Sequence, residues 1–161
     1  MRKIILWGHK HYTDTASYYL VCLYRTFQKL GYDVYWFDDR EYPTQQEFDY
    51  KNSVFVIDNQ SLSFGMIDIQ KHIPFAEVIH HPVVIDKNYE LQYANGIIKK
   101  LLIFSWYSFL GMHRKVAPQI NQVITPSLNS KKDIEKYLNV NPENIDVIPN
   151  GIDTETFEPK S

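Results

Sequence analysis

The feature that most constrains the fold is an alternation of short apolar runs with longer segments of helical spacing. Six of the runs are rich in β-branched and aromatic residues, which favours strands. Because the runs are almost continuously apolar, they are typical of strands covered on both faces. The alternation predicts an α/β fold with a Rossmann-like, doubly wound, mainly parallel sheet. The predicted strands are residues 3–7, 33–37, 53–58, 76–80, 121–125 and 145–149.

Helical spacing is clearest in three segments between these strands. From Thr15 onward apolar residues recur at helical intervals as far as Gly31, which stands where a helix C-cap belongs. Residues 97–116 predict one long helix, and its all-round apolarity favours a buried core element. Ser127 is the expected N-cap of a third helix. The inner side of that helix is predicted to hold Leu128, Ile134, Tyr137 and Leu138. The pattern is weakest over residues 40–75, where "EYPTQQEFDYKN" is expected to form a short helix or a loop.

Composition narrows the class of protein. A chain of 161 residues suits one domain, and a formal net charge of −2 gives no indication of a nucleic-acid surface. The single cysteine, Cys22, cannot form an internal disulfide, which favours a reducing, cytoplasmic location. The first apolar run is too short for a signal peptide, and Lys99 and Lys100 interrupt the longest apolar stretch. A spanning helix is therefore not expected, whereas peripheral contact with a membrane stays open.

The loop after the first predicted strand is the first candidate site, because parallel sheets bind ligands at the carboxyl ends of their strands. Gly8 allows a ligand to approach the backbone, and His9 and His11 add polar or proton-transferring groups. There is no GxGxxG, so dinucleotide binding is not supported. The competing interpretation is a polar loop that caps the following helix.

Two adjacent histidines, His80 and His81, end the fourth predicted strand and precede Pro82. Neighbouring residues of an extended chain point to opposite sides, so one imidazole should face the crevice and the other should face away. Adjacent positions converge poorly on a metal, and no HExxH or CxxC is present, so no metal is expected. The competing interpretation is a pair of structural histidines. His72 and His113 are assigned no role.

The C-terminal third resembles a known family. The segment "QVITPSLNSKKDIEKYLNVNPENIDVIPNGIDTETFEP" is similar to the end of the N-terminal domain of family 4 glycosyltransferases, which have the GT-B fold. A second block, "HHPVVID" with "SWYSFLGMHRKV", resembles a subset of these enzymes with His-His-Pro, a following Asp and a Trp-Tyr helix. With "LGYDVYWF", which follows the first predicted helix, the resemblance spans most of residues 1–161, with residues 40–75 excepted.

The resemblance implies half of a two-domain enzyme whose active site lies between two Rossmann-like domains. Residues 1–148 would form the acceptor-side domain, and residues 149–161, with Asn150, Gly151 and Asp153, the interdomain connector. The C-terminal donor-binding domain is expected to be absent from this chain. The nucleotide sugar would then be shared with a C-terminal or separately encoded domain, and the chain alone would be inactive. The resemblance also implies transfer with retention of the anomeric configuration, usually without a metal, so no cofactor or metal is expected.

The resemblance also implies roles for single residues. The family has a histidine just after the fourth core strand that contacts the transferred sugar. His80 matches it best and is the catalytic candidate, with His81 as the competing choice. The family usually has two glycines after the first strand, where this chain has only Gly8. The expected substrate-binding residues are Gly8, His9, His11, His81 and Asp86.

The leading hypothesis is therefore the acceptor-side half of a retaining hexosyltransferase, acting on a glycan, a lipid or another acceptor. The alternative is a stand-alone, non-catalytic domain that binds a glycan or a protein. A flavodoxin-like or regulator domain is a weaker third hypothesis, which only Asp58 at the end of a predicted strand supports.

Overall fold

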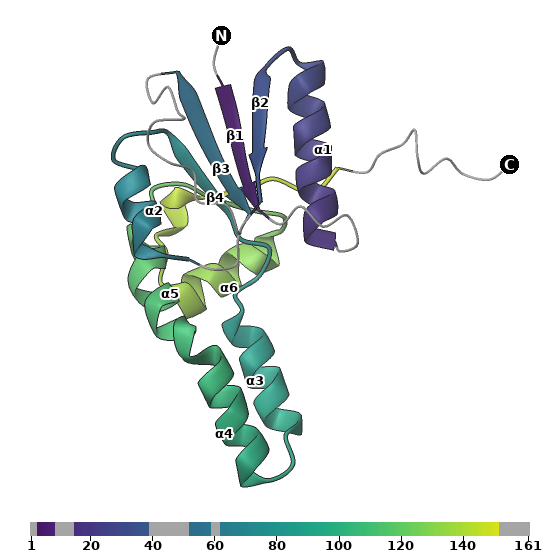
Figure 1. The fold of residues 1–161 in the computed structure, drawn as a ribbon. Helices are drawn as coiled ribbons and strands as arrows, with labels where there is room; N and C mark the ends of the chain where they lie inside the picture. Colours follow the sequence, from purple (N-terminus) through teal and green to yellow (C-terminus); the bar gives the residue numbers. More distant parts are fainter. Residues whose placement is uncertain (1–2, 9–14, 39–51, 59–61, 152–161) are drawn as a thin grey trace, which may run out of the picture.

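The computed structural model describes residues 3–8, 15–38, 52–58 and 62–151. These residues contain one parallel six-stranded sheet with the strand order β2-β1-β3-β4-β5-β6 (Figure 1). The α/β, Rossmann-like fold predicted from the sequence is confirmed. The strands are β1 Lys3–Gly8, β2 Asp33–Phe37, β3 Ser53–Asp58, β4 Phe75–Val78, β5 Val123–Thr125 and β6 Ile145–Val147.

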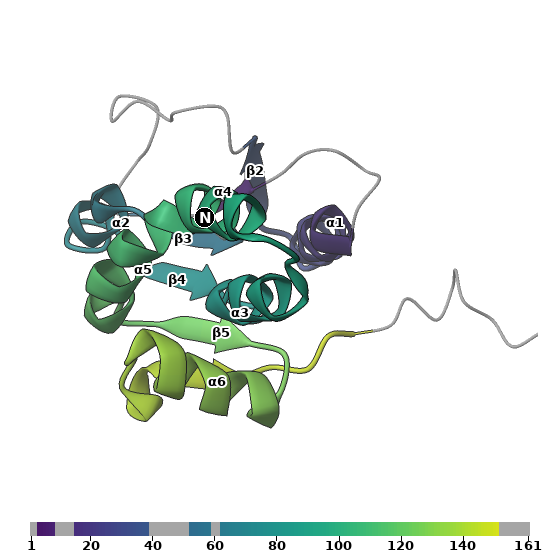
Figure 2. The same ribbon diagram turned by 90° about the horizontal axis from the view of Figure 1, so that it is seen from below.

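Helices cover both faces of this sheet. Seen from below, α1 lies on one side of the molecule and α2 and α5 on the other (Figure 2). The α-helices are α1 Thr15–Lys29, α2 Phe64–Ile69, α3 Val84–Tyr93, α4 Ile97–Trp106, α5 Leu110–Val116 and α6 Leu128–Leu138. The 3-10 turns are η2 Tyr107–Phe109, η3 Ala117–Gln119 and η4 Pro142–Asn144.

The hydrophobic core has two main parts, one on each face of the sheet, because successive side chains of a strand point to opposite faces. Ile4 and Leu6 of β1 pack with Leu20 of α1 on one face. Ile5 and Trp7, which point the opposite way, belong to a larger cluster that includes side chains of α2, α5 and α6. Strand β1 is thus covered on both faces, which explains its continuous apolar sequence.

The predicted ends of two helices are confirmed. Gly31 follows α1 with a positive φ of 83°, and its N–H donates to the Gln28 carbonyl at 2.9 Å. At the start of α6, the Ser127 hydroxyl accepts from the Ser130 N–H at 3.0 Å. Ile134 is fully buried, as expected. Leu128 is 68% exposed, so its predicted inward position is wrong: it lies in the first helical turn, rotated away from Ile134.

The helix predicted over residues 97–116 is instead divided into α4, η2 and α5. Helices α3 and α4 form a hairpin that projects away from the sheet, so the sheet covers little of it (Figure 1). The prediction that this segment is a buried core element is wrong for α4. More than half of each side chain is exposed at Ile97, Ile98, Leu101, Leu102, Phe104 and Trp106.

The hairpin has a small apolar cluster of its own, built around Val84 of α3 and Ile103 of α4 with Tyr107. The Tyr107 hydroxyl donates to the Glu90 carboxylate at 2.8 Å, which joins the end of α4 back to α3. Burial and this hydrogen bond raise the pKa of Tyr107 to about 12. Within the described part of the chain, no helix is long and apolar enough to cross a membrane.

Candidate active site

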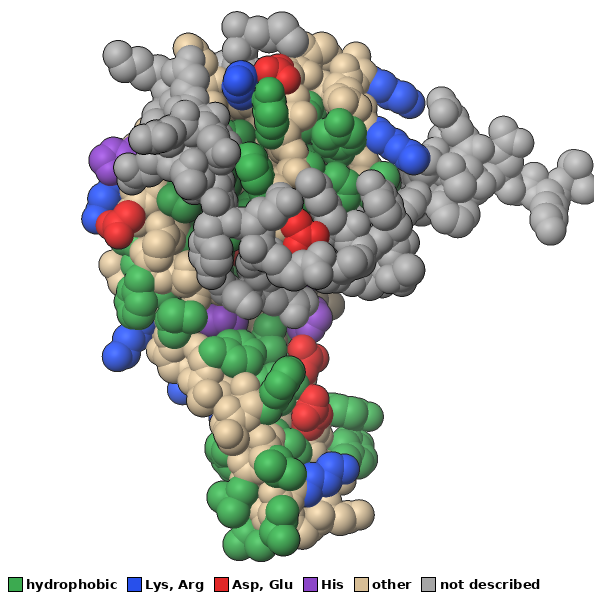
Figure 3. Space-filling model, viewed as in Figure 1, with side chains coloured by type: hydrophobic (Ala, Val, Ile, Leu, Met, Phe, Trp, Pro, Cys, Tyr) green, Lys and Arg blue, Asp and Glu red, His purple; other side chains and the backbone are tan. Residues whose placement is uncertain are grey.

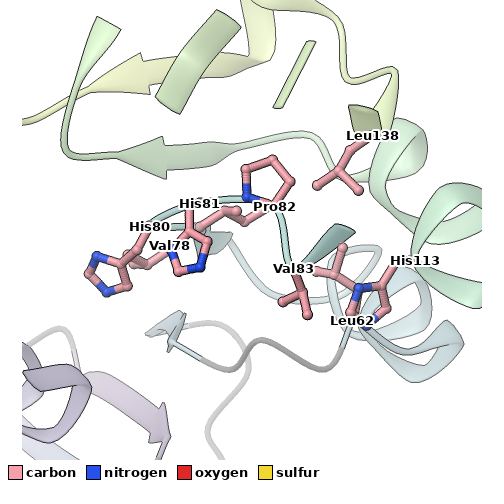
Figure 4. Close-up of a pocket in the computed structure, with 9 residues that line it drawn as sticks. Leu62, Val78, His80, His81, Pro82, Val83, His113 and Leu138 are labelled. Atoms are coloured by element: carbon pink, nitrogen blue, oxygen red, sulfur yellow. The ribbon is translucent and has the colours of Figure 1, made fainter. Parts of the chain in front are cut away.

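A pocket opens at the carboxyl edge of the sheet, directly after β4. It measures about 290 Å³ including the open space at its mouth, and residues 78–83 form most of its lining. Leu62, His113 and Leu138 close it from other parts of the fold (Figure 4). Strand β4 ends at Val78, two residues earlier than predicted, so both adjacent histidines belong to the segment that follows the strand.

His80 is positioned by the first helix. Its ring lies edge-on to the ring of Tyr19 in α1, with a centroid separation of 5.1 Å and an interplanar angle of 89°. Edge-to-face packing of this kind restrains an aromatic ring without closing off all of its polar atoms. His80 is half-buried and borders the pocket, so it is not part of the hydrophobic interior.

His81 is held by a different helix, α3. Its Nε2 lies 3.0 Å from Oδ2 of Asp86, in the first turn of α3. A carboxylate only accepts hydrogen bonds, so Nε2 donates in this contact, and in the neutral tautomer Nδ1 is left as an acceptor. The side chains of His81 and Asp86 are 44% and 46% exposed, so solvent weakens the electrostatic attraction between them, and the main effect of the contact is to orient the His81 ring.

The two imidazoles thus contact different helices although they are adjacent in sequence. Both border the pocket, and the chain bends at these positions rather than continuing as a strand. Strict alternation of side chains therefore does not extend to His80 and His81, which is why strand geometry alone cannot assign their orientation.

His113 of α5 is a pocket residue that the sequence analysis missed. It is only 3% exposed, and its Nε2 has no hydrogen-bond partner among the described residues. Burial lowers the pKa of His113, which keeps the ring neutral near pH 7. Figure 4 shows it beside Leu62, across the labelled group from His80 and His81. The sequence did contain a signal for this burial. His113 lies three residues from both Leu110 and Val116, so helical spacing puts it on the same buried side of the helix.

Gly8 ends β1 and pairs with Asp58 of β3, so β3 separates it from β4 and the histidine pair. Its carbonyl accepts a hydrogen bond from the Trp36 indole at 3.2 Å. His9 and His11 lie outside the described residues. Of the expected site residues, the structure therefore brings together His80, His81 and Asp86. His113 joins them as a pocket residue that was not expected.

Electrostatics limit what this pocket can bind. None of its described lining residues is Lys or Arg, the side chains that usually neutralise a nucleotide diphosphate. No group of three or more His, Cys, Asp or Glu among the described residues could hold a metal ion. The available polar groups are imidazoles, which exchange hydrogen bonds with hydroxyl groups.

A six-stranded parallel sheet with a histidine-lined pocket at its carboxyl edge places the chain in the Rossmann-like class of α/β domains. The chain also matches Glycosyltransferase Family 4 over residues 54–156, which is more than half of its length. The protein therefore belongs to glycosyltransferase family 4, as its sequence motifs predicted.

A curated relative gives a more specific similarity. The chain is 38% identical over 106 residues to the "MMP alpha-(1->4)-mannosyltransferase" of Mycolicibacterium hassiacum. The alignment covers 65% of this chain but only 26% of the relative. The similarity thus concerns about a quarter of that protein.

Proposed function

We propose that this chain is the acceptor-side half of a retaining glycosyltransferase that moves a hexose from a nucleotide sugar to a glycan, a lipid or another acceptor. Family membership and the similarity to a mannosyltransferase support hexose transfer. The observation that carries the proposal is the His80–His81 pair at the carboxyl edge of β4, bordering an open pocket. Residues 1–148 form the acceptor-side unit, and residues 149–161 the connector.

In this proposal the pocket binds sugar hydroxyl groups. His80, restrained by Tyr19, exchanges a hydrogen bond with a hydroxyl of the transferred sugar. Such a contact also stabilises the positive charge that develops at the anomeric carbon as the leaving group departs. His81, oriented by Asp86, presents Nδ1 as an acceptor to a second hydroxyl.

The donor phosphates are bound elsewhere in this proposal. The lack of cationic side chains among the described pocket residues supports a division of labour, because a diphosphate needs positive charge or many N–H donors. A second domain, in the same chain or separately encoded, supplies those groups and completes the enzyme. Gly8, His9 and His11 are proposed to contact the substrate from the loop after β1.

The test is a chimaera in which residues 1–148 are joined to the part of the M. hassiacum mannosyltransferase that follows its matched segment. Transfer from a labelled nucleotide sugar is measured for the parent, His80→Ala and His81→Ala. His72→Ala is the matched control, because His72 is exposed and does not border the pocket. We expect His80→Ala to lower turnover by about a hundredfold or more, with circular dichroism unchanged.

Two results would change the proposal. Near-normal turnover in His80→Ala would remove His80 from the mechanism, and a loss confined to His81→Ala would transfer the role to His81. Glycan binding by calorimetry with no transfer, even in an intact chimaera, would favour the non-catalytic binding domain.

A further inference from the structure

Helix α4 exposes an unusually large apolar surface. Six of its side chains, here called the α4 outer face, are between 52% and 76% exposed. In the space-filling view, hydrophobic side chains gather on the projecting hairpin, with Lys or Arg side chains among them (Figure 3). Contiguous apolar surface on this scale marks an interaction site. The α4 outer face consists of Ile97, Ile98, Leu101, Leu102, Phe104 and Trp106.

The geometry of α4 explains why this face points outward. Ile103, which is 7% exposed, packs into the cluster shared with α3. At roughly 3.6 residues per turn, Ile98 and Leu101 lie on the side opposite Ile103. Ile97, Leu102 and Phe104 extend the apolar surface around both edges of that side. The helix therefore uses a narrow stripe for folding and leaves a broad one uncovered.

The charges of the hairpin tip are all positive. Between Tyr93 and Trp106 the sequence contains two charged residues, Lys99 and Lys100, and no acidic residue. They precede Ile103 by four and three positions, so they flank the side nearest α3 and not the outer face. A third lysine, Lys87 of α3, lies over the ring of Phe104 at 4.5 Å.

The apolar surface and the lysines of α4 fit a lipid surface better than a second copy of the chain. A broad apolar stripe bordered by lysines is typical of helices that lie in a lipid interface, where the long side chains reach the headgroups. A symmetric contact between two copies through the α4 outer face would leave Lys99 and Lys100 outside the contact, with no acidic residue of α4 to pair with them. An anionic lipid surface instead attracts each lysine.

We propose that the α4 outer face docks on anionic lipid bilayers, with its aliphatic and aromatic side chains at the acyl boundary and Lys99 and Lys100 among the headgroups. Helix α3 begins at Val84, directly after the pocket segment. Its length of 10 residues, about 15 Å, would hold the histidine pocket at a fixed distance above the lipid. The docking does not depend on the proposed sugar transfer.

The first experiment measures co-sedimentation of the chain with vesicles of phosphatidylcholine alone or containing phosphatidylglycerol. The variant Ile98→Gln/Leu102→Gln removes apolar surface while keeping good helix formers. Its matched control is Leu30→Gln/Leu128→Gln, because these leucines are 66% and 68% exposed on other parts of the fold. We expect parent and control to bind the anionic vesicles, and binding by the α4 variant to fall at least tenfold.

The second experiment tests the charge. Lys99→Gln/Lys100→Gln should weaken partitioning onto anionic vesicles about thirtyfold, at about 1 kcal/mol for each lysine near a charged surface. Lys132→Gln, on the exposed side of α6, is the control and should change little.

Three outcomes would overturn the proposal. The parent chain could fail to bind anionic vesicles, or it could bind both vesicle types equally. Sedimentation velocity without lipid could also show a dimer that the α4 variant abolishes while vesicles remain unbound, which would assign the face to a second copy. Because no sugar is present in these assays, each outcome leaves the proposed transferase function to its own test.

Discussion

Replacing Ile103 by alanine tests whether α4 is oriented as described, with one buried stripe and one exposed face. Ile103 is 7% exposed within the cluster formed by Val84, Ala94, Tyr107 and Leu110. The substitution removes three side-chain carbons, which at about 0.8 kcal/mol for each buried CH2 corresponds to about 2.4 kcal/mol. An unfilled cavity adds to this cost, giving a loss of about 2.5–4 kcal/mol.

The matched control lies in the same helix and involves the same residue type. Ile98 is 73% exposed, so Ile98→Ala removes little buried surface and improves helix propensity slightly. We expect it to change the free energy of unfolding by less than about 0.5 kcal/mol. The pair therefore separates burial from every other consequence of shortening an isoleucine.

Hydrogen exchange locates the effect, because the hairpin's own cluster is small and local opening is expected to dominate there. Amides of residues 84–106 should exchange at least about fiftyfold faster in Ile103→Ala, because the transfer part of the loss alone, about 2.4 kcal/mol, produces that ratio. Urea unfolding gives the global value. Equal losses in Ile98→Ala and Ile103→Ala would refute the orientation, since both sides of α4 would then be covered.

Three further predictions concern other elements. Ser127→Ala removes the side-chain acceptor for the Ser130 N–H and should cost about 1 kcal/mol in urea unfolding. Because burial lowers the pKa of His113, the unfolded chain binds that proton more readily, so stability should fall as pH drops below the ordinary pKa of 6.5. His113→Leu should flatten this part of the pH–stability curve. The pKa of Tyr107 is raised from 10.0 to about 12, so its contribution to stability should be lost as pH rises through that range. In a spectrophotometric titration, Tyr107→Phe should remove a late-ionising phenol.

The strands could be predicted from the sequence because their signal is local. Residues 33–37 and 53–58 were assigned with the bounds that the structure shows. The errors concern strand ends: β4 stops at Val78 although the apolar Ile79 follows, and β5 begins at Val123 and not at the predicted Asn121. Hydrogen-bond pairing with a neighbouring strand sets such limits, and a single segment does not contain that information.

The candidate site was predictable only in part. The rule that parallel sheets bind ligands at their carboxyl edge led to His80 and His81, and the structure places a pocket there. It could not lead to His113, which reaches the pocket from a helix more than thirty residues later in the sequence. The contact of His81 with Asp86 likewise depends on α3, a helix that the sequence analysis did not assign.

The error at α4 has a physical explanation that bears on the lipid proposal. A helix that is apolar on most faces satisfies the pattern of a core helix and that of an interfacial helix equally well. The difference lies in what surrounds the helix. A core helix is enclosed by other elements, whereas α4 contacts its own hairpin partner and extends beyond the sheet. Within the sequence of α4, only Lys99 and Lys100 indicate a surface helix. A helix enclosed on all sides would leave their two ammonium groups without water, and both residues are exposed in the structure. The same lysines that interrupt the apolar run therefore indicate that α4 lies at a surface and favour an anionic one.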